Sequence, residues 1–366
     1  MTRRWLFIVT LLLLLSYPHN AESAKAALSQ ARSPSLVGWV VAKQGRVKLF
    51  PRGKRQHAKA AQLCMKFELG DLLSVAPGGQ ATIVCTDLKE YPLSPGVHGL
   101  PCRPSGRDVL SFQNSQVIPT RSDVENAGFP QILAPRKTKL LTPYPLLRWT
   151  SVAGIDSYQI SLMNKGNVTW SMTVNATTEL RYPTTAPALE FGETYKLVVA
   201  ADKRSSEEEE LPGLGFSVLN DMDAQRVHQA EAEIRKLGLP NASIRFLLSR
   251  LYAASGLHSE AIEQLSGLHS VASEAAVTQQ LGDLYRLIGL NRQAEGQYVQ
   301  TLKLMRLSND LSGQVRVQID LGQLYEAFGN KKEAERYWLQ AKQLCSQIGD
   351  KQKANQIQTA LAKLMQ

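Results

Sequence analysis

The sequence lacks the residue patterns by which the common enzyme classes are recognised. It has no nucleophile elbow with an ordered Ser, His and Asp, and no glycine-rich phosphate loop. It also has no His-Glu-x-x-His zinc motif and no close carboxylate pair in a defined context. These absences favour a non-catalytic protein with no cofactor and no metal. An enzyme with an unfamiliar site is the alternative.

Long hydrophobic runs are scarce, and the one present lies at the N-terminus. Two arginines precede an apolar run at residues 5–15, and Pro18 breaks that run before a series of small residues. This order predicts a secretory signal peptide at 1–23, cleaved after Ser23 or, alternatively, after Ala26. The run is shorter than the about 20 residues of a membrane span, although an uncleaved anchor is an alternative. We therefore expect an exported protein, periplasmic or associated with the cell envelope.

Cysteine is rare, and three of the four cysteines lie between residues 36 and 118. Disulfides are expected in an exported domain, because its compartment is oxidising. We predict a disulfide between Cys85 and Cys102, since the proline- and glycine-rich segment between them is a loop that needs a cross-link. Cys64 and Cys345 are then expected to be buried thiols. The spacing of cysteines and histidines does not fit a zinc site.

Clusters of one charge are few, although the net charge is +10 and the pI is about 9.4. Export and the thin spread of basic residues argue against nucleic-acid binding. The densest basic patch is either a solvated loop or a site for an anionic envelope polymer. The glutamates at 207–210 are expected to form a solvated loop and not a calcium site. The residues of the basic patch are Arg52, Lys54, Arg55 and Lys59.

Residues 36–118 contain short alternating strands separated by glycines and prolines, which predicts a small β sandwich or barrel. Gly70 and Asp71 predict a tight turn in which the glycine has positive φ and the Asp side chain accepts from backbone amides. A strand ending in Gly-x-Val, a variable loop, Gly-Asp-x-Leu and a strand of Ala-x-Val type together resemble the periplasmic FecR-type domain. The anti-sigma portion that would relay a signal to the cytoplasm has no counterpart here.

Residues 119–137, with three prolines, are interpreted as a linker, and a second β region follows at 138–219. The spacing of Leu189, Gly192 and Tyr195 resembles the corner of a fibronectin type III sandwich. In that fold the Tyr hydroxyl bonds back to upstream backbone. The same resemblance matches Trp149 to the core Trp of the second strand and Tyr158 to the Tyr of the third. The resemblance implies a spacer or binding module without catalytic residues.

One five-residue phrase recurs in the C-terminal third of the chain. Leu-Gly-Asp-Leu-Tyr at 281–285 is repeated as Leu-Gly-Gln-Leu-Tyr at 321–325, and a looser copy occupies 248–252. Such self-similarity indicates stacked helical units and not a single-cored fold. Gly282 and Gly322 are expected to let paired helices approach closely, while Leu and Tyr fill the space between them.

These positions resemble the tetratricopeptide repeat (TPR), a family of paired helices that serve as binding scaffolds. The first repeat departs from the family pattern at Leu265 and Leu268 and the second at Thr301, and none has the usual Trp near its start. The 40 residues between the second and third copies exceed the usual TPR period, so longer helices or a longer turn are expected there. A closing helix is expected at 351–365. The third repeat matches the family at Leu321, Gly322, Tyr325, Gly329, Ala334, Trp338 and Ala341.

In the TPR family, partners bind the concave groove formed by the first helix of each repeat. The resemblance places polar residues of this chain in that groove, and their polarity fits either partner binding or plain solvent exposure. Reversal of the three arginines among them is expected to leave folding nearly intact. The predicted groove residues are Arg250, Ala253, Asp283, Arg286, Arg316, Gln323 and Glu326.

We therefore predict a multidomain protein: a FecR-like β domain, a fibronectin type III-like sandwich, and an all-α TPR-like repeat domain at 221–366. The predicted function is a non-catalytic envelope scaffold that binds another protein through the repeats. The alternative is a glycan- or peptidoglycan-binding envelope protein that acts through its β modules.

Overall fold

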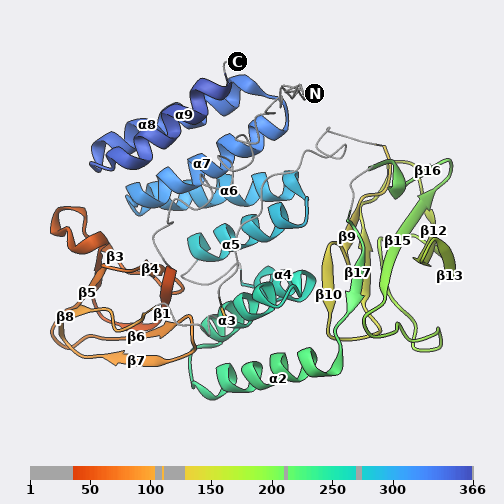
Figure 1. Ribbon diagram of the computed structural model, residues 1–366, viewed down its shortest axis with the longest axis horizontal. Coiled ribbons are helices and arrows are strands. Elements are labelled where there is room, and N and C mark those ends of the chain that lie inside the picture. Colours follow the sequence, from red (N-terminus) through yellow and green to blue (C-terminus); the bar gives the residue numbers. More distant parts are fainter. Residues whose placement is uncertain (1–35, 104–108, 111–127, 210–212, 269–273, 365–366) are drawn as a thin grey trace, which may run out of the picture. The chain divides into compact units, whose positions relative to one another are not determined.

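The structure is a computed structural model, and the order of its elements confirms the predicted fold class. Strands occupy residues 36–218 and helices follow from residue 221 (Figure 1). The predicted signal peptide lies outside the described residues. The residues left undescribed are 1–35, 104–108, 111–127, 210–212, 269–273 and 365–366.

The first β module consists of two four-stranded antiparallel sheets. Alternate residues of its strands point inward, and Val40, Phe67, Leu73 and Ile83 are fully buried. One sheet has the order β4 (Lys66–Glu68), β1 (Leu36–Gln44), β6 (Gln80–Cys85) and β7 (Glu90–Leu93). The other has the order β3 (Lys59–Ala60), β2 (Val47–Phe50), β5 (Leu72–Val75) and β8 (Gly96–Gly99).

Two predicted details of this module are confirmed. Gly70 has a φ of 91°, and the Asp71 carboxylate accepts from the backbone N–H of Arg52 at 2.8 Å and of Glu68 at 2.9 Å. Cys85 and Cys102 form a disulfide with their Cα atoms 5.4 Å apart. The loop between them is therefore tied to the core.

The second β module is a sandwich of two sheets. The larger sheet has the order β10 (Thr138–Leu140), β17 (Phe216–Val218), β15 (Thr194–Ala201), β12 (Ser157–Asn164) and β13 (Asn167–Asn175), with β16 (Arg204–Ser205) paired to β15. The smaller sheet has the order β14 (Glu179–Arg181), β11 (Leu146–Trp149) and β9 (Ile132–Ala134).

The interior of the sandwich contains the aromatic residues that the sequence placed there. Trp149 is buried and packs edge-on against Tyr158, with ring centroids 5.7 Å apart. The Tyr195 hydroxyl accepts from the Glu190 backbone N–H at 3.0 Å, which confirms the predicted corner bond. The fibronectin type III resemblance itself stays a prediction.

The predicted linker at 119–137 is wrong at its C-terminal end. Within it, β9 pairs with β11, so the sandwich begins before residue 138. Arg136, also in the predicted linker, is completely buried. The prolines of this segment do not exclude a strand, because proline is compatible with short edge strands.

The C-terminal third forms stacked helical hairpins, as predicted. The 17-residue α6 is almost twice as long as the nine-residue α4, which explains the larger offset between the second and third copies of the repeated phrase. The helices are α2 (Asp221–Lys236), α3 (Asn241–Ala254), α4 (His258–Ser266), α5 (Glu274–Leu287), α6 (Asn291–Leu307), α7 (Leu311–Ala327), α8 (Lys331–Gln347) and the closing α9 (Lys351–Leu364).

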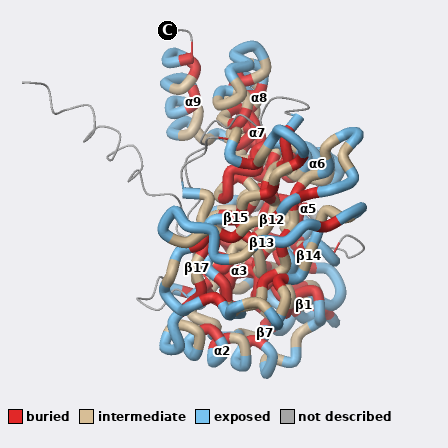
Figure 2. Tube along the Cα trace, turned by 90° about the vertical axis from the view of Figure 1, so that its right-hand side faces the viewer, coloured by how far each residue is buried: buried red, intermediate tan, exposed pale blue. Residues whose placement is uncertain are grey.

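The repeated glycines have the predicted role. A Cβ atom built on Gly282 would lie 2.6 Å from the Tyr298 ring of α6, and one on Gly322 would lie 3.0 Å from the Trp338 ring of α8. Each glycine therefore lets the next helix place an aromatic ring against it. Figure 2 shows buried and exposed residues alternating along α9, as expected of a helix packed on one side.

One hydrophobic cluster is shared between the first β module and the helices. It joins Trp39 and Val84 of the strands to Phe246 and Leu247 of α3. The ring centroids of Trp39 and Phe246 are 6.3 Å apart. In the described part of the chain, no helix is both long and apolar enough to cross a membrane.

Candidate functional site

The first helices of the hairpins, α3, α5 and α7, carry the predicted groove residues. Leu248, Leu281 and Leu321 of the repeated phrase are buried between helices. The polar residues beside them consequently point away from the hairpin interior, because neighbouring helix positions lie about 100° apart. This local geometry fits the prediction, but the surroundings of these residues differ from an open groove.

Arg250 is 7% exposed, so the expectation of a solvent-facing arginine is wrong at this position. Its Nε donates to the Leu110 carbonyl at 3.1 Å, and its guanidinium lies 4.9 Å from the centre of the Trp39 ring. Both contacts come from segments N-terminal to the helical array. Burial lowers the pKa of Arg250 to about 10. Ala253, one turn further along α3, is also buried.

Arg286 is 5% exposed, and it too departs from the expected exposure. It donates to the Gln323 side-chain oxygen at 2.8 Å and lies 3.6 Å from the Asp320 carboxylate. Burial raises the pKa of Asp320 to about 6, although the charge of Arg286 acts in the opposite direction. Arg286 thus links α5 to α7.

The other predicted residues remain more accessible. Asp283 is half-buried and accepts from the Tyr298 hydroxyl at 2.8 Å. Arg316 and Gln323 are half-buried, whereas Glu326 is exposed. The structure therefore joins Arg286 to Gln323 and holds Asp283 against Tyr298, and it leaves Glu326 exposed near the C-terminal end of α7.

A residue from the basic patch of the first β module also reaches the helices. Lys59 forms an ion pair with Asp310 at 2.9 Å, next to the N-terminus of α7. Lys59 is therefore engaged within the chain and is not part of a free basic surface. Arg52 and Lys54 of the same patch are exposed.

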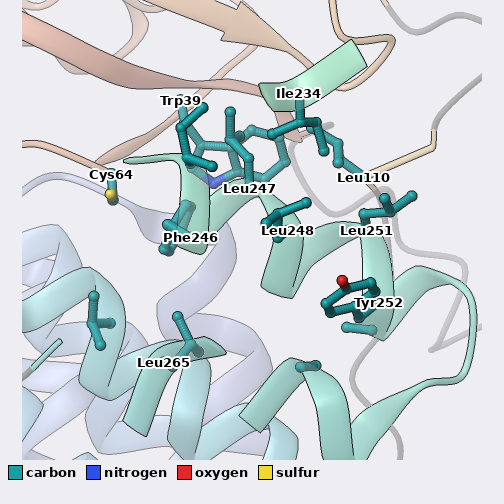
Figure 3. Close-up of a cluster of buried hydrophobic side chains, with 14 of the residues drawn as sticks. Trp39, Cys64, Leu110, Ile234, Phe246, Leu247, Leu248, Leu251, Tyr252 and Leu265 are labelled. Carbon is teal, nitrogen blue, oxygen red and sulfur yellow. The ribbon is translucent and has the colours of Figure 1, made fainter. Parts of the chain in front are cut away.

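A cavity of about 80 Å³ lies between the segment 59–66 and helices α3, α5 and α7. Lys66, Arg250 and Arg316 give its lining a basic character, and Asp283 opposes them. Burial lowers the pKa of Lys66 to about 7, and the charges of Arg316 and Arg250 act in the same direction. Trp39, Cys64 and Phe246 line this cavity and belong to the hydrophobic cluster shown in Figure 3.

The second β module contacts the turn before α4 through one side-chain hydroxyl and one backbone N–H of β10. The Thr138 hydroxyl of β10 accepts from the His258 backbone N–H at 2.8 Å, where α4 begins without a side-chain cap of its own. The Lys139 backbone N–H donates to the Gly256 carbonyl at 2.8 Å. Strand β10 therefore provides hydrogen-bond partners for a backbone carbonyl in the turn before α4 and for a backbone N–H in the first turn of α4.

Sequence reasoning missed the buried pair of Arg136 and Glu209. Their side chains have no exposed surface, and the guanidinium donates to both carboxylate oxygens at 2.6 Å. Arg136 also donates to the carbonyls of Ile288 and Gly289, at the C-terminal end of α5. Glu209 belongs to the glutamate run that was predicted to be a solvated loop, and at this residue the prediction is wrong. No local signal distinguishes Glu209 from its neighbours in the run.

No group of three or more His, Cys, Asp or Glu side chains in the described part of the chain is arranged to hold a metal ion. The described face of α3, α5 and α7 carries amide, guanidinium and carboxylate groups beside buried aliphatic side chains. These groups suit recognition of a polypeptide by hydrogen bonds and ion pairs.

No family model and no curated protein matches this chain. Similar solved structures include BtubC (BKLC) from P. vanneervenii, with 17% identity over 39% of this chain and 72% of that chain, and a TM-score of 0.28. Another is a protein described as a kinesin light chain with nearly identical TPR-like repeats, from Podosopora anserina. It has 18% identity over 39% of this chain and 86% of that chain, and a TM-score of 0.29. Scores this low carry no argument about function, so the repeat assignment rests on the helices and glycines described above.

Proposed function

We propose that this chain is a non-catalytic scaffold of the cell envelope that binds another protein through its helical repeats. The observation that carries the proposal is that the face formed by α3, α5 and α7 already holds polypeptide. Arg250 binds the Leu110 carbonyl, and Asp310 binds Lys59. Polar groups of the same kinds that stay accessible on this face, such as the Glu326 carboxylate, would recognise main chain and basic side chains of a partner.

The proposed partner surface contains fewer residues than the predicted groove, because several of the predicted residues are buried. Arg250 and Arg286 are buried within the chain, whereas Gln323 is half-buried and Glu326 is exposed. We therefore place partner contact on the C-terminal half of α7. A partner that reaches the cavity beside Lys66 would have to displace the first β module.

Affinity capture from an envelope extract tests the proposal. The full chain should retain a defined protein, and the substitution Glu326→Lys should reduce its recovery at least about tenfold, as expected when an interface residue is replaced. The matched control is Glu233→Lys, at an exposed position of α2 outside the groove.

The control should capture as well as the unmodified chain, and both variants should keep its circular dichroism spectrum. Equal capture by the folded Glu326→Lys variant and the control would exclude the α7 surface. Cell fractionation tests the envelope location separately, and recovery of the chain in the cytoplasm would contradict it. Glycan binding by the β modules remains the alternative, and sedimentation with peptidoglycan distinguishes it.

A further inference from the structure

Strand β13 forms an open edge of the second β module. It is the last strand of its sheet, and among the described strands it pairs only with β12 (Figure 1). One side of its backbone therefore presents N–H and C=O groups without a strand partner in the described part of the chain. Unpaired edges bind other strands unless the protein protects them.

The other described edge strands carry such protection. The opposite edge, β10, is covered by the turn before α4, where Lys139 donates to Gly256. Strand β14 has only three residues, two of them charged, and β9 also has three. In the first module, β7 contains Pro92, β4 has a charge at each end, β3 has two residues and β8 begins and ends with glycine.

Strand β13 has none of these features. It is nine residues long and contains neither a charged residue nor a proline. Val168 is 59% exposed and Met172 is 43% exposed, which is unusual for large apolar side chains on an edge. Trp170 fixes the strand against the sandwich, with its ring 5.0 Å from that of Tyr182. The edge is therefore long, anchored and uncharged.

The sequence of β13 is almost a palindrome, Asn-Val-Thr-Trp-Ser-Met-Thr-Val-Asn, centred on Ser171. When two antiparallel copies are related by a two-fold axis at the centre, each residue faces its mirrored position. Trp170 then faces Met172, a favourable sulfur–aromatic pair, and no like charges meet. The mirrored identical pairs are Asn167 with Asn175, Val168 with Val174, and Thr169 with Thr173.

We propose that β13 pairs with β13 of a second copy of this chain, antiparallel and centred on Ser171. A β-bulge opposite Leu162 and Met163 leaves Thr169 as the extra residue of β13. The bulge bends the strand near Val168, so the ladder between copies is centred on residues 170–172. This short ladder makes a small interface, and the dimer dissociates on dilution.

Sedimentation equilibrium of the full chain tests the pairing. We expect a monomer of 40.4 kDa in equilibrium with a species of twice that mass. Ser171→Lys should remove the dimer, because it sets two like charges opposite each other at the axis. The matched control is Ser161→Lys, since Ser161 lies directly opposite Ser171 on the adjacent inner strand. The control should still dimerise.

Cysteine cross-linking tests the register. Ser171→Cys should give a covalent dimer on oxidation, because paired Cα atoms lie about 4.5–5.5 Å apart across an antiparallel ladder. Ser161→Cys should not, since one further strand on each side separates the two copies. A chain that stays monomeric overturns the proposal. A dimer that survives Ser171→Lys, or cross-links as well through residue 161, also overturns it.

Discussion

At the scale of single residues, the structure differs most from expectation where charges are buried. Arg136 and Glu209 form an ion pair without exposed surface, and Arg136 also binds the two carbonyls that follow α5, those of Ile288 and Gly289. Burial of charge is costly unless each group is paired and hydrogen-bonded. Here one guanidinium satisfies a carboxylate and a helix end, which ties the second β module to the repeats.

We therefore expect Arg136→Met to lower the free energy of unfolding by about 3–5 kcal/mol, because Glu209 would lose its guanidinium partner. Urea unfolding followed by circular dichroism measures this. Arg148→Ala is the matched control, since Arg148 forms an exposed pair with Glu179. That control should change the same quantity by less than about 1 kcal/mol. Similar losses in both variants would contradict a special role for the buried pair.

The buried Lys66 is expected to make the free energy of unfolding depend on pH. Its pKa is lowered from 10.5 to about 7 by burial and by the neighbouring arginines. Between pH 7 and 10.5 the unfolded chain therefore binds more protons at this residue than the folded chain, and stability rises with pH through that window. Well below pH 7 both states are protonated and this dependence ends.

The comparison with Lys66→Met isolates the effect, because the methionine does not titrate. The unfolding free energy of the unmodified chain, relative to that variant, should increase from pH 7 to pH 10 and level off about one unit below the folded pKa of about 7. Urea titrations at each pH measure it. Parallel pH profiles of the two proteins would show that Lys66 titrates normally.

At the scale of helices, small residues set how closely the hairpins pack. Gly282 faces the Tyr298 ring too closely for a methyl group, and Gly322 faces the Trp338 ring so closely that a methyl group would require a small shift of the ring. These aromatic residues lie on the second helix of each hairpin and are buried. The repeated Leu-Gly-x-Leu-Tyr sequence therefore sets the distance between the two helices of a hairpin as well as forming an apolar face.

Gly282→Ala should lower the free energy of unfolding by about 1–3 kcal/mol, because the ring of Tyr298 has to move. Gly296→Ala in α6 is the matched control, since no atom lies within 4 Å of the added Cβ. There the better helix propensity of alanine should raise the unfolding free energy by about 0.5–1 kcal/mol. Opposite signs in thermal melts would support the close contact, and two stabilising substitutions would refute it.

At the scale of the whole molecule, the repeats share their core with the first β module. Trp39, Cys64 and Leu110 belong to the same buried cluster as Phe246 and Leu247. The Ser243 hydroxyl also donates to the Val41 carbonyl. The repeats are therefore less independent than the sequence suggested.

The fragment 221–366 should consequently be helical but less stable than the full chain, because it leaves apolar surface of α3 uncovered. We expect a lower melting temperature and binding of a hydrophobic dye, with the full chain as the control. Thermal melts and dye fluorescence measure these quantities. A fragment that melts at the temperature of the full chain without binding dye would show that the shared cluster contributes little.

The sequence by itself determined the order of β modules and repeats, the Cys85–Cys102 pair, the Gly70–Asp71 turn and the helix contacts at Gly282 and Gly322. Each of these depends on residues close in sequence or on a repeated pattern, and such patterns reflect local backbone geometry and one-sided burial. The partner-binding role of the groove residues stays a prediction.

Only the tertiary structure decided what covers Arg250, what pairs with Glu209, and where the linker ends. Arg250 meets Leu110, 140 residues earlier in the chain, and Arg136 meets Gly289, 153 residues later. Contacts over such separations leave no periodic pattern in the sequence, because the two partners are distant along the chain and come into contact only when it folds. The polarity of these residues fitted partner binding and plain solvent exposure equally well, and the fold decided that Arg250, Arg136 and Glu209 instead bind other parts of the chain.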